Sequence, residues 1–226
     1  MRRGTFAAAA LAALFASSAQ AQTPVATPEI QRSLIAFSDS AEFAALRREQ
    51  QQRVITTWGE TCAPSVQMRR TDITLLSDIA LDQDGKVQSG SWLERHEVVG
   101  CKYTTRANFA MSVTPGQPTR VIPLLPGSSV ANTRLQLDIL PGVVGVAMAT
   151  RKDPDCKQRP VFADTAFNGW TGAPVPDALS GPTSRPWEET WAVYLCGRVI
   201  DVVIRFTPDS KGTGYDIPGK DAHMRP

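Results

Sequence analysis

The chain has 226 residues, of which 42% are hydrophobic, 20% charged and 7% aromatic. A chain of this length can bury one core of ordinary size or two closely packed half-domains. Residues 1–21 contain two of its 24 basic residues and none of its 22 acidic ones, so the remainder is formally neutral. A neutral balance excludes the strong basic charge that is typical of proteins binding DNA, RNA or an anionic membrane.

Residues 1–21 are predicted to be a cleaved secretory signal peptide. Arg2 and Arg3 supply a positive start, an Ala- and Leu-rich stretch follows over residues 6–15, and Ala19-Gln20-Ala21 fits the small-x-small cleavage pattern. The apolar stretch is too short to span a bilayer, and no other apolar run approaches spanning length, so we expect no membrane span. The mature chain is expected to be periplasmic or secreted, in the manner of small exported bacterial proteins.

One residue pattern occurs twice, almost a hundred positions apart. Trp92-x-Glu94-x-His96-x-Val98-x-x-Cys101 returns as Trp187-x-Glu189-x-Trp191-x-Val193-x-x-Cys196. Each copy also has a second cysteine at nearly the same distance upstream, Cys62 in the first and Cys156 in the second. Agreement of several uncommon residues at one spacing indicates an internal duplication.

The duplication selects one of three possible disulfide pairings, Cys62–Cys101 together with Cys156–Cys196. Each bridge would close a loop of about 40 residues and stabilise the fold by about 4 kcal/mol. Redox or metal chemistry is the alternative, but the chain has no Cys-x-x-Cys motif and only two histidines. We therefore predict structural disulfides, with no metal site and no cofactor.

The first copy is expected to begin with helices. A short helix is predicted over Ile30–Phe37, and Asp39, with Glu42 three residues on, can cap a longer helix that ends near Trp58. Alternating apolar residues then predict strands, with a hairpin turn at Asp82-Gln83-Asp84-Gly85. These strands are expected over residues 73–81, 92–99 and 103–113.

The second copy allows a strand register to be predicted. A two-residue turn at Cys196-Gly197 would pair Leu195 with Arg198, Val193 with Ile200, Trp191 with Val202, Glu189 with Ile204 and Trp187 with Phe206. The last four pairs are apolar apart from Glu189, so they predict the core face of an antiparallel hairpin. The opposite face should be wet, and it carries Glu188, Thr190, Asp201 and Arg205.

Residues 133–149 fit either a hairpin that turns at Pro141 or a helix that Asn132 caps and Pro141 kinks. We favour the helix, because the duplication places a helix before the first cysteine of each repeat. Loops are predicted over residues 119–126 and 168–186, and the second of these is rich in Gly, Pro and Ser.

The expected fold class is α+β. Two tandem repeats, residues 39–115 and 132–208, would each combine a helix with an antiparallel hairpin, and both would share one sheet in a single domain over residues 29–208. A flexible leader over residues 22–28 and a polar tail over residues 209–226 would flank this domain.

Glu94 and Glu189 are the candidate catalytic carboxylates, because each shares an apolar strand face, where an unpartnered charge is costly. A duplicated pair could act on glycans if the two carboxylates lay about 5–10 Å apart in an open cleft. The favoured alternative is a structural role, with hydrogen bonds to the backbone or an ion pair to an arginine. His96, in the position of Trp191, is interpreted as a packed residue.

Trp170 is the candidate binding residue, with Phe167 and Asn168 beside it. An aromatic side chain on a Gly/Pro-rich loop can meet a partner, whereas Trp92 and Trp187 are expected to be buried core residues.

The chain lacks the Gly-x-Ser-x-Gly nucleophile motif and any phosphate-binding glycine loop. We therefore expect a non-catalytic binding or interaction module whose partner is a protein, an envelope component or a small ligand. One alternative is an inhibitor of an envelope hydrolase, acting through the loop that carries Trp170. The other is a glycan hydrolase that would use Glu94 and Glu189.

Overall fold

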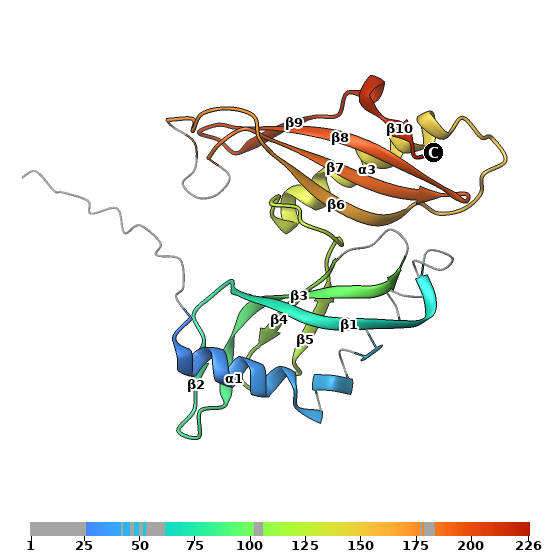
Figure 1. The fold of residues 1–226 in the computed structure, drawn as a ribbon. Helices are drawn as coiled ribbons and strands as arrows, with labels where there is room; N and C mark the ends of the chain where they lie inside the picture. The colour runs from blue at the N-terminus through green and yellow to red at the C-terminus, as the bar shows by residue number, and fades with distance from the viewer. Residues whose placement is uncertain are drawn as a thin grey trace, which may run out of the picture.

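The computed structural model describes residues 26–41, 43–45, 48–49, 52, 62–101, 106–176, 178 and 184–226, without the side chains of residues 62–65 and 101. The predicted signal peptide, most of the leader, the helix end expected at Trp58 and the turn expected after Cys101 lie outside this part. The described residues form an α+β structure with two antiparallel sheets, one in each half (Figure 1). The fold class is confirmed, but the single shared sheet was wrong.

The N-terminal half is a five-stranded sheet with a helix on one face. Its elements are α1 (Pro28–Ser38), β1 (Cys62–Leu75), β2 (Ala80–Leu81), β3 (Val87–Cys101), β4 (Arg106–Val113) and β5 (Arg120–Pro123). The strand order is β1-β3-β4-β5, and β2 pairs with β3. Leu34 of α1 packs with Trp92 and Phe109, and all three are fully buried in the core of this half.

Side-chain caps fix where the N-terminal helices begin. Thr27 accepts a hydrogen bond from the backbone N–H of Ile30 at 3.2 Å, which starts α1 close to its predicted position. The next helical residues, from position 41, are capped by Ser40, which accepts from the N–H of Phe43 at 3.3 Å. The predicted cap, Asp39, instead pairs with Arg70 at 3.1 Å, and that ion pair draws its carboxylate away from the helix start.

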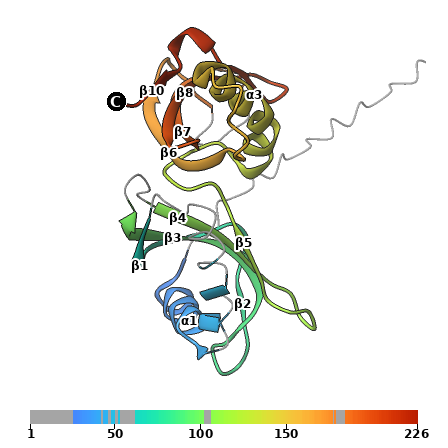
Figure 2. The same ribbon diagram turned by 90° about the vertical axis from the view of Figure 1, so that its right-hand side faces the viewer.

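The C-terminal half repeats this plan with a longer helix. Its elements are α3 (Thr133–Arg151), β6 (Val161–Trp170), β7 (Trp187–Leu195), β8 (Arg198–Pro208), β9 (Thr213–Asp216), the 3-10 turn η2 (Gly219–Asp221) and β10 (His223–Met224). The strand order is β10-β8-β7-β6, and β9 pairs with β8. The helix α3 packs along one face of this sheet, as Figure 2 shows from the side.

The predicted register of the β7–β8 hairpin is confirmed at every pair, from Trp187 opposite Phe206 to Leu195 opposite Arg198. Cys196 and Gly197 both have positive φ, 47° and 75°, as a two-residue turn between twisted strands requires. The predicted turn before β3 is confirmed as well. There, Gly85 has φ 75°, and Asp82 accepts from the N–H of Lys86 at 2.8 Å.

The helical interpretation of residues 133–149 is also confirmed. The side chain of Asn132 accepts from the N–H of Leu135 at 2.9 Å and caps α3, which then continues through Pro141. None of the described helices combines the length and the apolar character needed to cross a bilayer.

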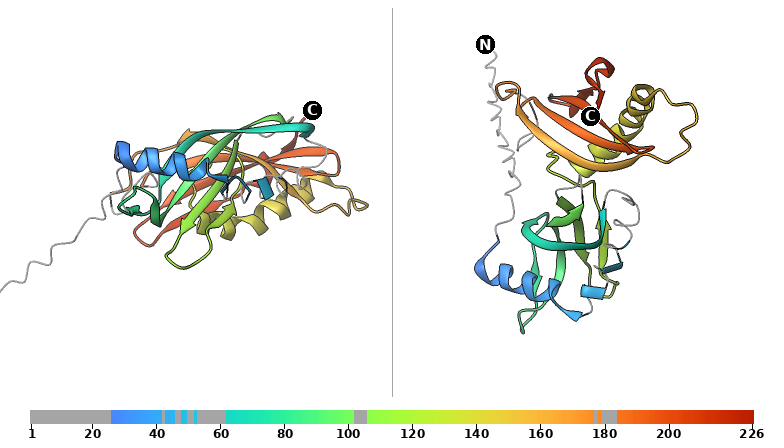
Figure 3. Two further views of the ribbon diagram at one scale, coloured as in Figure 1. Left: turned by 90° about the horizontal axis from the view of Figure 1, so that it is seen from below. Right: turned by 45° about the vertical axis from the view of Figure 1, so that its right-hand side comes forward.

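The linker between the halves explains why the chain does not build one sheet. Residues 124–131 pass between β4 and β6 and bond to both, so the two strands never pair directly (Figure 3). On one side, the amide of Asn108 donates to the carbonyls of Leu125 at 2.7 Å and Gly127 at 3.0 Å. On the other, the N–H of Ser128 donates to the carbonyl of Thr165 at 2.5 Å. Each sheet consequently has its own core.

Several segments expected to be loop or tail are strands. Residues 120–123 pair with β4, residues 168–170 complete β6, and the expected tail contributes β9 and β10 to the edge of the second sheet. Backbone groups at a sheet edge need partners, and edge positions tolerate the Pro and Gly residues that suggested loops.

The returning C-terminus also changes the face that was expected to be wet. Asp201 is only 8% exposed, because Arg225 lies over it and donates two hydrogen bonds of 2.8 Å to its carboxylate. Arg205 on the same face is exposed, and it bonds Glu188 and Asp221.

Candidate functional site

The repeated Trp-x-Glu pattern lies on the central strand of each sheet. Because side chains alternate along a strand, Trp92-x-Glu94-x-His96 on β3 and Trp187-x-Glu189-x-Trp191 on β7 each project toward the core. All six side chains are at most 1% exposed. Each half therefore holds one carboxylate inside its own hydrophobic core.

The carboxylate of Glu189 joins the sheet to the start of α3. Its Oε1 accepts from the indole Nε1 of Trp187 at 2.9 Å and from the backbone N–H groups of Val130 at 2.9 Å and Ala131 at 3.3 Å. Its Oε2 accepts from the indole Nε1 of Trp191 at 2.7 Å. These bonds compensate for burying the carboxyl group.

Glu94 has the matching role in the first half. Its Oε1 accepts from the Nε1 of Trp92 at 3.1 Å and from the hydroxyl of Ser38, and its Oε2 lies 3.1 Å from the Nε2 of His96. The Nδ1 of His96 has no hydrogen-bond partner among the described residues. A proton on Nε2, directed at Glu94, is the arrangement that leaves no buried donor unpaired.

The two carboxylates hold equivalent points of the chain. Ser38 stands two residues before the cap Ser40, and Val130 stands two residues before the cap Asn132. In each half, the buried glutamate therefore binds the segment that leads into a capped helix. This shared geometry supports the duplication inferred from the sequence.

Two opposing effects act on the pKa of Glu94. Burial raises the pKa of its carboxyl group, but hydrogen bonds from His96, Ser38 and Trp92 outweigh burial and hold this pKa below its ordinary value of 4.5. The carboxylate is thus ionised throughout the neutral range, whereas a general acid needs a raised pKa.

The lowered pKa of Glu94 predicts how stability depends on pH. An ionised Glu94 favours folding above its unfolded pKa of about 4.5, and this contribution is lost as pH falls through the lower folded pKa. The free energy of unfolding of the wild type should therefore fall below about pH 4.5 more steeply than that of Glu94→Gln, which cannot titrate. Denaturant titrations across this range measure both slopes, and equal slopes would contradict the assignment.

Neither carboxylate is accessible to a substrate. Glu94 and Glu189 are both 0% exposed and lie in separate cores, whereas paired glycosidase carboxylates face each other across an open cleft. The geometry favours the structural role for both.

Trp170 lies at the end of β6, and not in a loop. A β-bulge between Phe167 and Gly169 inserts one extra residue opposite β7, and Gly169 has φ 137° there. The bulge brings Phe167 and Trp170 to the same face although they are three residues apart. Their ring centroids lie 5.1 Å apart, and Trp170 lies 6.3 Å from Trp187.

The ring of Trp170 is supported but incompletely covered. It is 38% exposed, and the guanidinium of Arg185 lies over it, 5.6 Å from the ring centroid. The Nε of Arg185 donates to the carbonyl of Gly172 at 3.1 Å, which holds the guanidinium in place. Sequence reasoning missed Arg185, because its position follows from contacts between segments apart in the sequence, the pairing of Trp170 with Trp187 and the hydrogen bond from Thr171 to Pro186.

Asn168 does not join this cluster. Its amide donates to Glu188 at 3.1 Å and to Thr190 at 2.9 Å, which places it on the opposite face of the sheet. The candidate surface is therefore Phe167, Trp170 and Arg185, hereafter the Trp170 surface.

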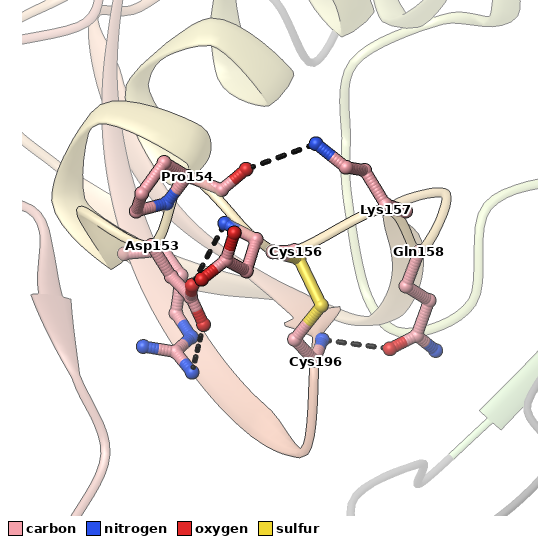
Figure 4. The surroundings of a disulfide bond; sticks show 8 residues. Asp153, Pro154, Cys156, Lys157, Gln158 and Cys196 are labelled. Atoms are coloured by element: carbon pink, nitrogen blue, oxygen red, sulfur yellow. Dashed lines mark hydrogen bonds and ion pairs between the residues drawn. A yellow bond between two sulfur atoms is a disulfide. The ribbon is translucent and has the colours of Figure 1, made fainter.

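One of the two predicted disulfides is confirmed. Cys156 and Cys196 are bonded, with their Cα atoms 5.9 Å apart, and the bond ties the segment after α3 to the β7–β8 turn (Figure 4). Gln158 reinforces this tie by accepting from the N–H of Cys196 at 2.7 Å. Cys62 and Cys101 are register partners between β1 and β3, and their side chains lie outside the described part.

In the part of the chain that the structure describes, no three His, Cys, Asp or Glu side chains gather as metal ligands would. Comparisons with models of protein families, with curated proteins and with solved structures found no match to this chain.

Proposed function

We propose that this chain is an exported, non-catalytic binding module that recognises a protein or an envelope component through the Trp170 surface. The observation that carries the proposal is a tryptophan left 38% exposed at a sheet end, with Phe167 and Trp187 against it and Arg185 over it. Tryptophan and arginine are the side chains that most often dominate binding energy at protein interfaces, particularly where packing holds them rigid.

A periplasmic or secreted location is part of this proposal. The Cys156–Cys196 disulfide is compatible with an oxidising compartment. The buried carboxylates of Glu94 and Glu189 support the proposal that the chain is not catalytic, because both already accept hydrogen bonds from groups within the fold.

Partner capture with matched variants tests the proposal. Tagged wild type, Trp170→Ala and Tyr215→Ala would each be cross-linked in the exported fraction of the source cell, purified and compared by quantitative mass spectrometry. Tyr215 is the control, because it is an aromatic residue 43% exposed on β9. We expect at least one component that the wild type and Tyr215→Ala retain and Trp170→Ala loses. An identical set of captured components for all three proteins would refute the Trp170 surface.

One observation favours the more specific proposal of a hydrolase inhibitor. The segment beyond Trp170 is braced by backbone hydrogen bonds of 2.9 Å from Thr171 to Pro186 and from Val175 to Ser184. These bonds hold residues 171–175 and 184–186 to each other, which lowers the entropic cost of ordering them against an active site. If the captured component is an envelope hydrolase, the purified chain should inhibit it at a one-to-one ratio, and Trp170→Ala should not.

A further inference from the structure

The guanidinium of Arg185 is held in place by groups that leave part of it free. Its Nε donates to the carbonyl of Gly172 at 3.1 Å, and its central carbon lies 5.6 Å from the ring centroid of Trp170. Within the described part of the chain, its terminal nitrogens Nη1 and Nη2 have no hydrogen-bond or ion-pair partner. Neither of them is among the buried polar atoms that lack a partner, so both nitrogens are open to solvent.

The two glutamates that follow Arg185 on β7 do not neutralise its charge. Glu188 accepts from Asn168 at 3.1 Å and from Arg205 at 3.3 Å, so its carboxylate belongs to the opposite face of the sheet. Glu189 is buried in the core and accepts from two indoles and two backbone N–H groups there. Because an arginine side chain stays protonated, the Trp170 surface carries a positive charge that no described carboxylate offsets.

The free end of this guanidinium fits a carboxylate. With Nε occupied by Gly172, the two terminal nitrogens form a planar fork that can bind both oxygens of one carboxylate. Phosphate groups and anionic lipid surfaces are bound by several basic side chains together or by the N–H groups of a helix start. The Trp170 surface supplies a single arginine, and one carboxylate balances its single charge.

We propose that the partner of the Trp170 surface is a protein segment that presents an aspartate or a glutamate beside an apolar residue. Nη1 and Nη2 of Arg185 would bind the carboxylate, and the apolar residue would pack on Trp170, which is 38% exposed. This inference rests on the proposed function and adds to it the chemistry of the partner.

The setting of Arg185 makes this pair stronger than an ordinary surface ion pair. Exposed pairs contribute little, because ordering two long side chains costs entropy. The bond to Gly172 and the ring of Trp170 order Arg185 before a partner binds, so part of that cost is absent. An apolar residue packed on Trp170 would also exclude water from the pair and strengthen its attraction.

Selection from a library of displayed random peptides tests this inference. The chain from Gln22 onward would be immobilised as wild type, Trp170→Ala, Arg185→Gln and Arg134→Gln. Arg134→Gln is the control, because the side chain of Arg134 is 86% exposed and already pairs with Asp138. Wild type and control should select peptides in which Asp or Glu adjoins an apolar residue. Trp170→Ala should select none of these peptides, and Arg185→Gln should show no preference for acidic residues.

A double-mutant cycle then isolates the ion pair. One selected peptide, and its variant with Gln or Asn in place of the acidic residue, would be titrated into wild type and Arg185→Gln by calorimetry. Loss of either charge should raise the dissociation constant about tenfold, and loss of both should raise it no further. The neutral peptide tests the pair on the unaltered protein as well. If Arg185→Gln weakened both peptides equally, Arg185 would only support Trp170, and the inference would be wrong.

The outcomes separate this inference from the proposed function. Peptides that need Trp170 but show no preference for acidic residues would overturn the carboxylate and leave the Trp170 surface in place. A wild type that selects no Trp170-dependent peptide would overturn the inference too. If it then sedimented with phosphatidylglycerol vesicles in a Trp170-dependent way, the surface would bind a lipid headgroup instead. The proposed function itself fails if Trp170→Ala also loses no component in partner capture from the exported fraction.

Discussion

Replacement of Trp187 by alanine should lower the free energy of unfolding by about 3–5 kcal/mol. The side chain is fully buried, and its ring stacks on Phe206 with centroids 4.4 Å apart and planes 4° from parallel. Its indole N–H is also one of the donors that satisfy Glu189, at 2.9 Å. The truncation therefore opens a cavity and removes a hydrogen bond from a buried carboxylate, and chemical denaturation measures the sum.

Trp170→Ala is the matched comparison, because both tryptophans belong to one ring cluster. Trp170 is 38% exposed and has no part in the bonding of Glu189, so its truncation should cost no more than about 1 kcal/mol. Equal losses for the two variants would mean that Trp170 is a core residue. The proposed binding surface would then lose its main side chain.

Gly127→Ala should lower the free energy of unfolding nearly as much as Trp187→Ala does, although it adds only one methyl group. Gly127 has φ 100°, and a Cβ there would collide with the backbone N and O of Thr165 and with the carboxylate of Asp164. The linker, residues 124–131, cannot move away from β6, because on its other side the N–H of Gly127 donates to the carbonyl of Arg106 at 2.9 Å. We expect the free energy of unfolding to fall by about 3 kcal/mol or more, because the backbone is strained and the linker separates from β6.

Gly116→Ala separates these two effects. Gly116 also has positive φ, 72°, but no atom lies within 4 Å of a Cβ placed there. Its substitution should cost only about 1 kcal/mol, the conformational part alone. If both alanine variants were equally stable in denaturant titrations, the close packing of the linker against β6 would be wrong.

The β7–β8 hairpin could be predicted in full because its information is local. A two-residue turn fixes the register, and alternation from Trp187 to Val193 then fixes the buried face. The helix α3 was also predictable. Asn132 is a typical helix cap, and the duplication places a helix before Cys156, so both favoured a helix over a hairpin that turns at Pro141. Local patterns of this kind identify hairpins and caps.

Contacts between distant segments could not be predicted in this way. The sequence does not show that residues 124–131 pass between β4 and β6, and without that linker a shared sheet is the simpler expectation. The partners of Glu94 and Glu189 outside their own strands come from more than 50 residues away, as in the 56-residue separation of Ser38 and Glu94. Only the fold reveals that both carboxylates are fully hydrogen-bonded.

The Trp170 surface could be predicted only in part for the same reason. The Gly- and Pro-rich composition after Phe167 suggested a loop. In the structure, β6 continues through a bulge at Gly169, which places Trp170 on the same face as Phe167. Asn168 was grouped with them by proximity in sequence, although alternation places it on the face opposite Phe167, and the bulge places it on the face opposite Trp170 as well. Arg185 joins them through contacts with the segment that follows Trp170.

Site-specific photocross-linking tests the central claim, that the Trp170 surface is where this chain meets its partner. A photoreactive phenylalanine analogue would replace Trp170 in one protein and Tyr215, on β9, in another, and each would be irradiated in the exported fraction. We predict a discrete cross-linked product from position 170 that competes away with excess unlabelled wild type, and no such product from position 215. Absence of a product from position 170, or the same product from both positions, would contradict the claim.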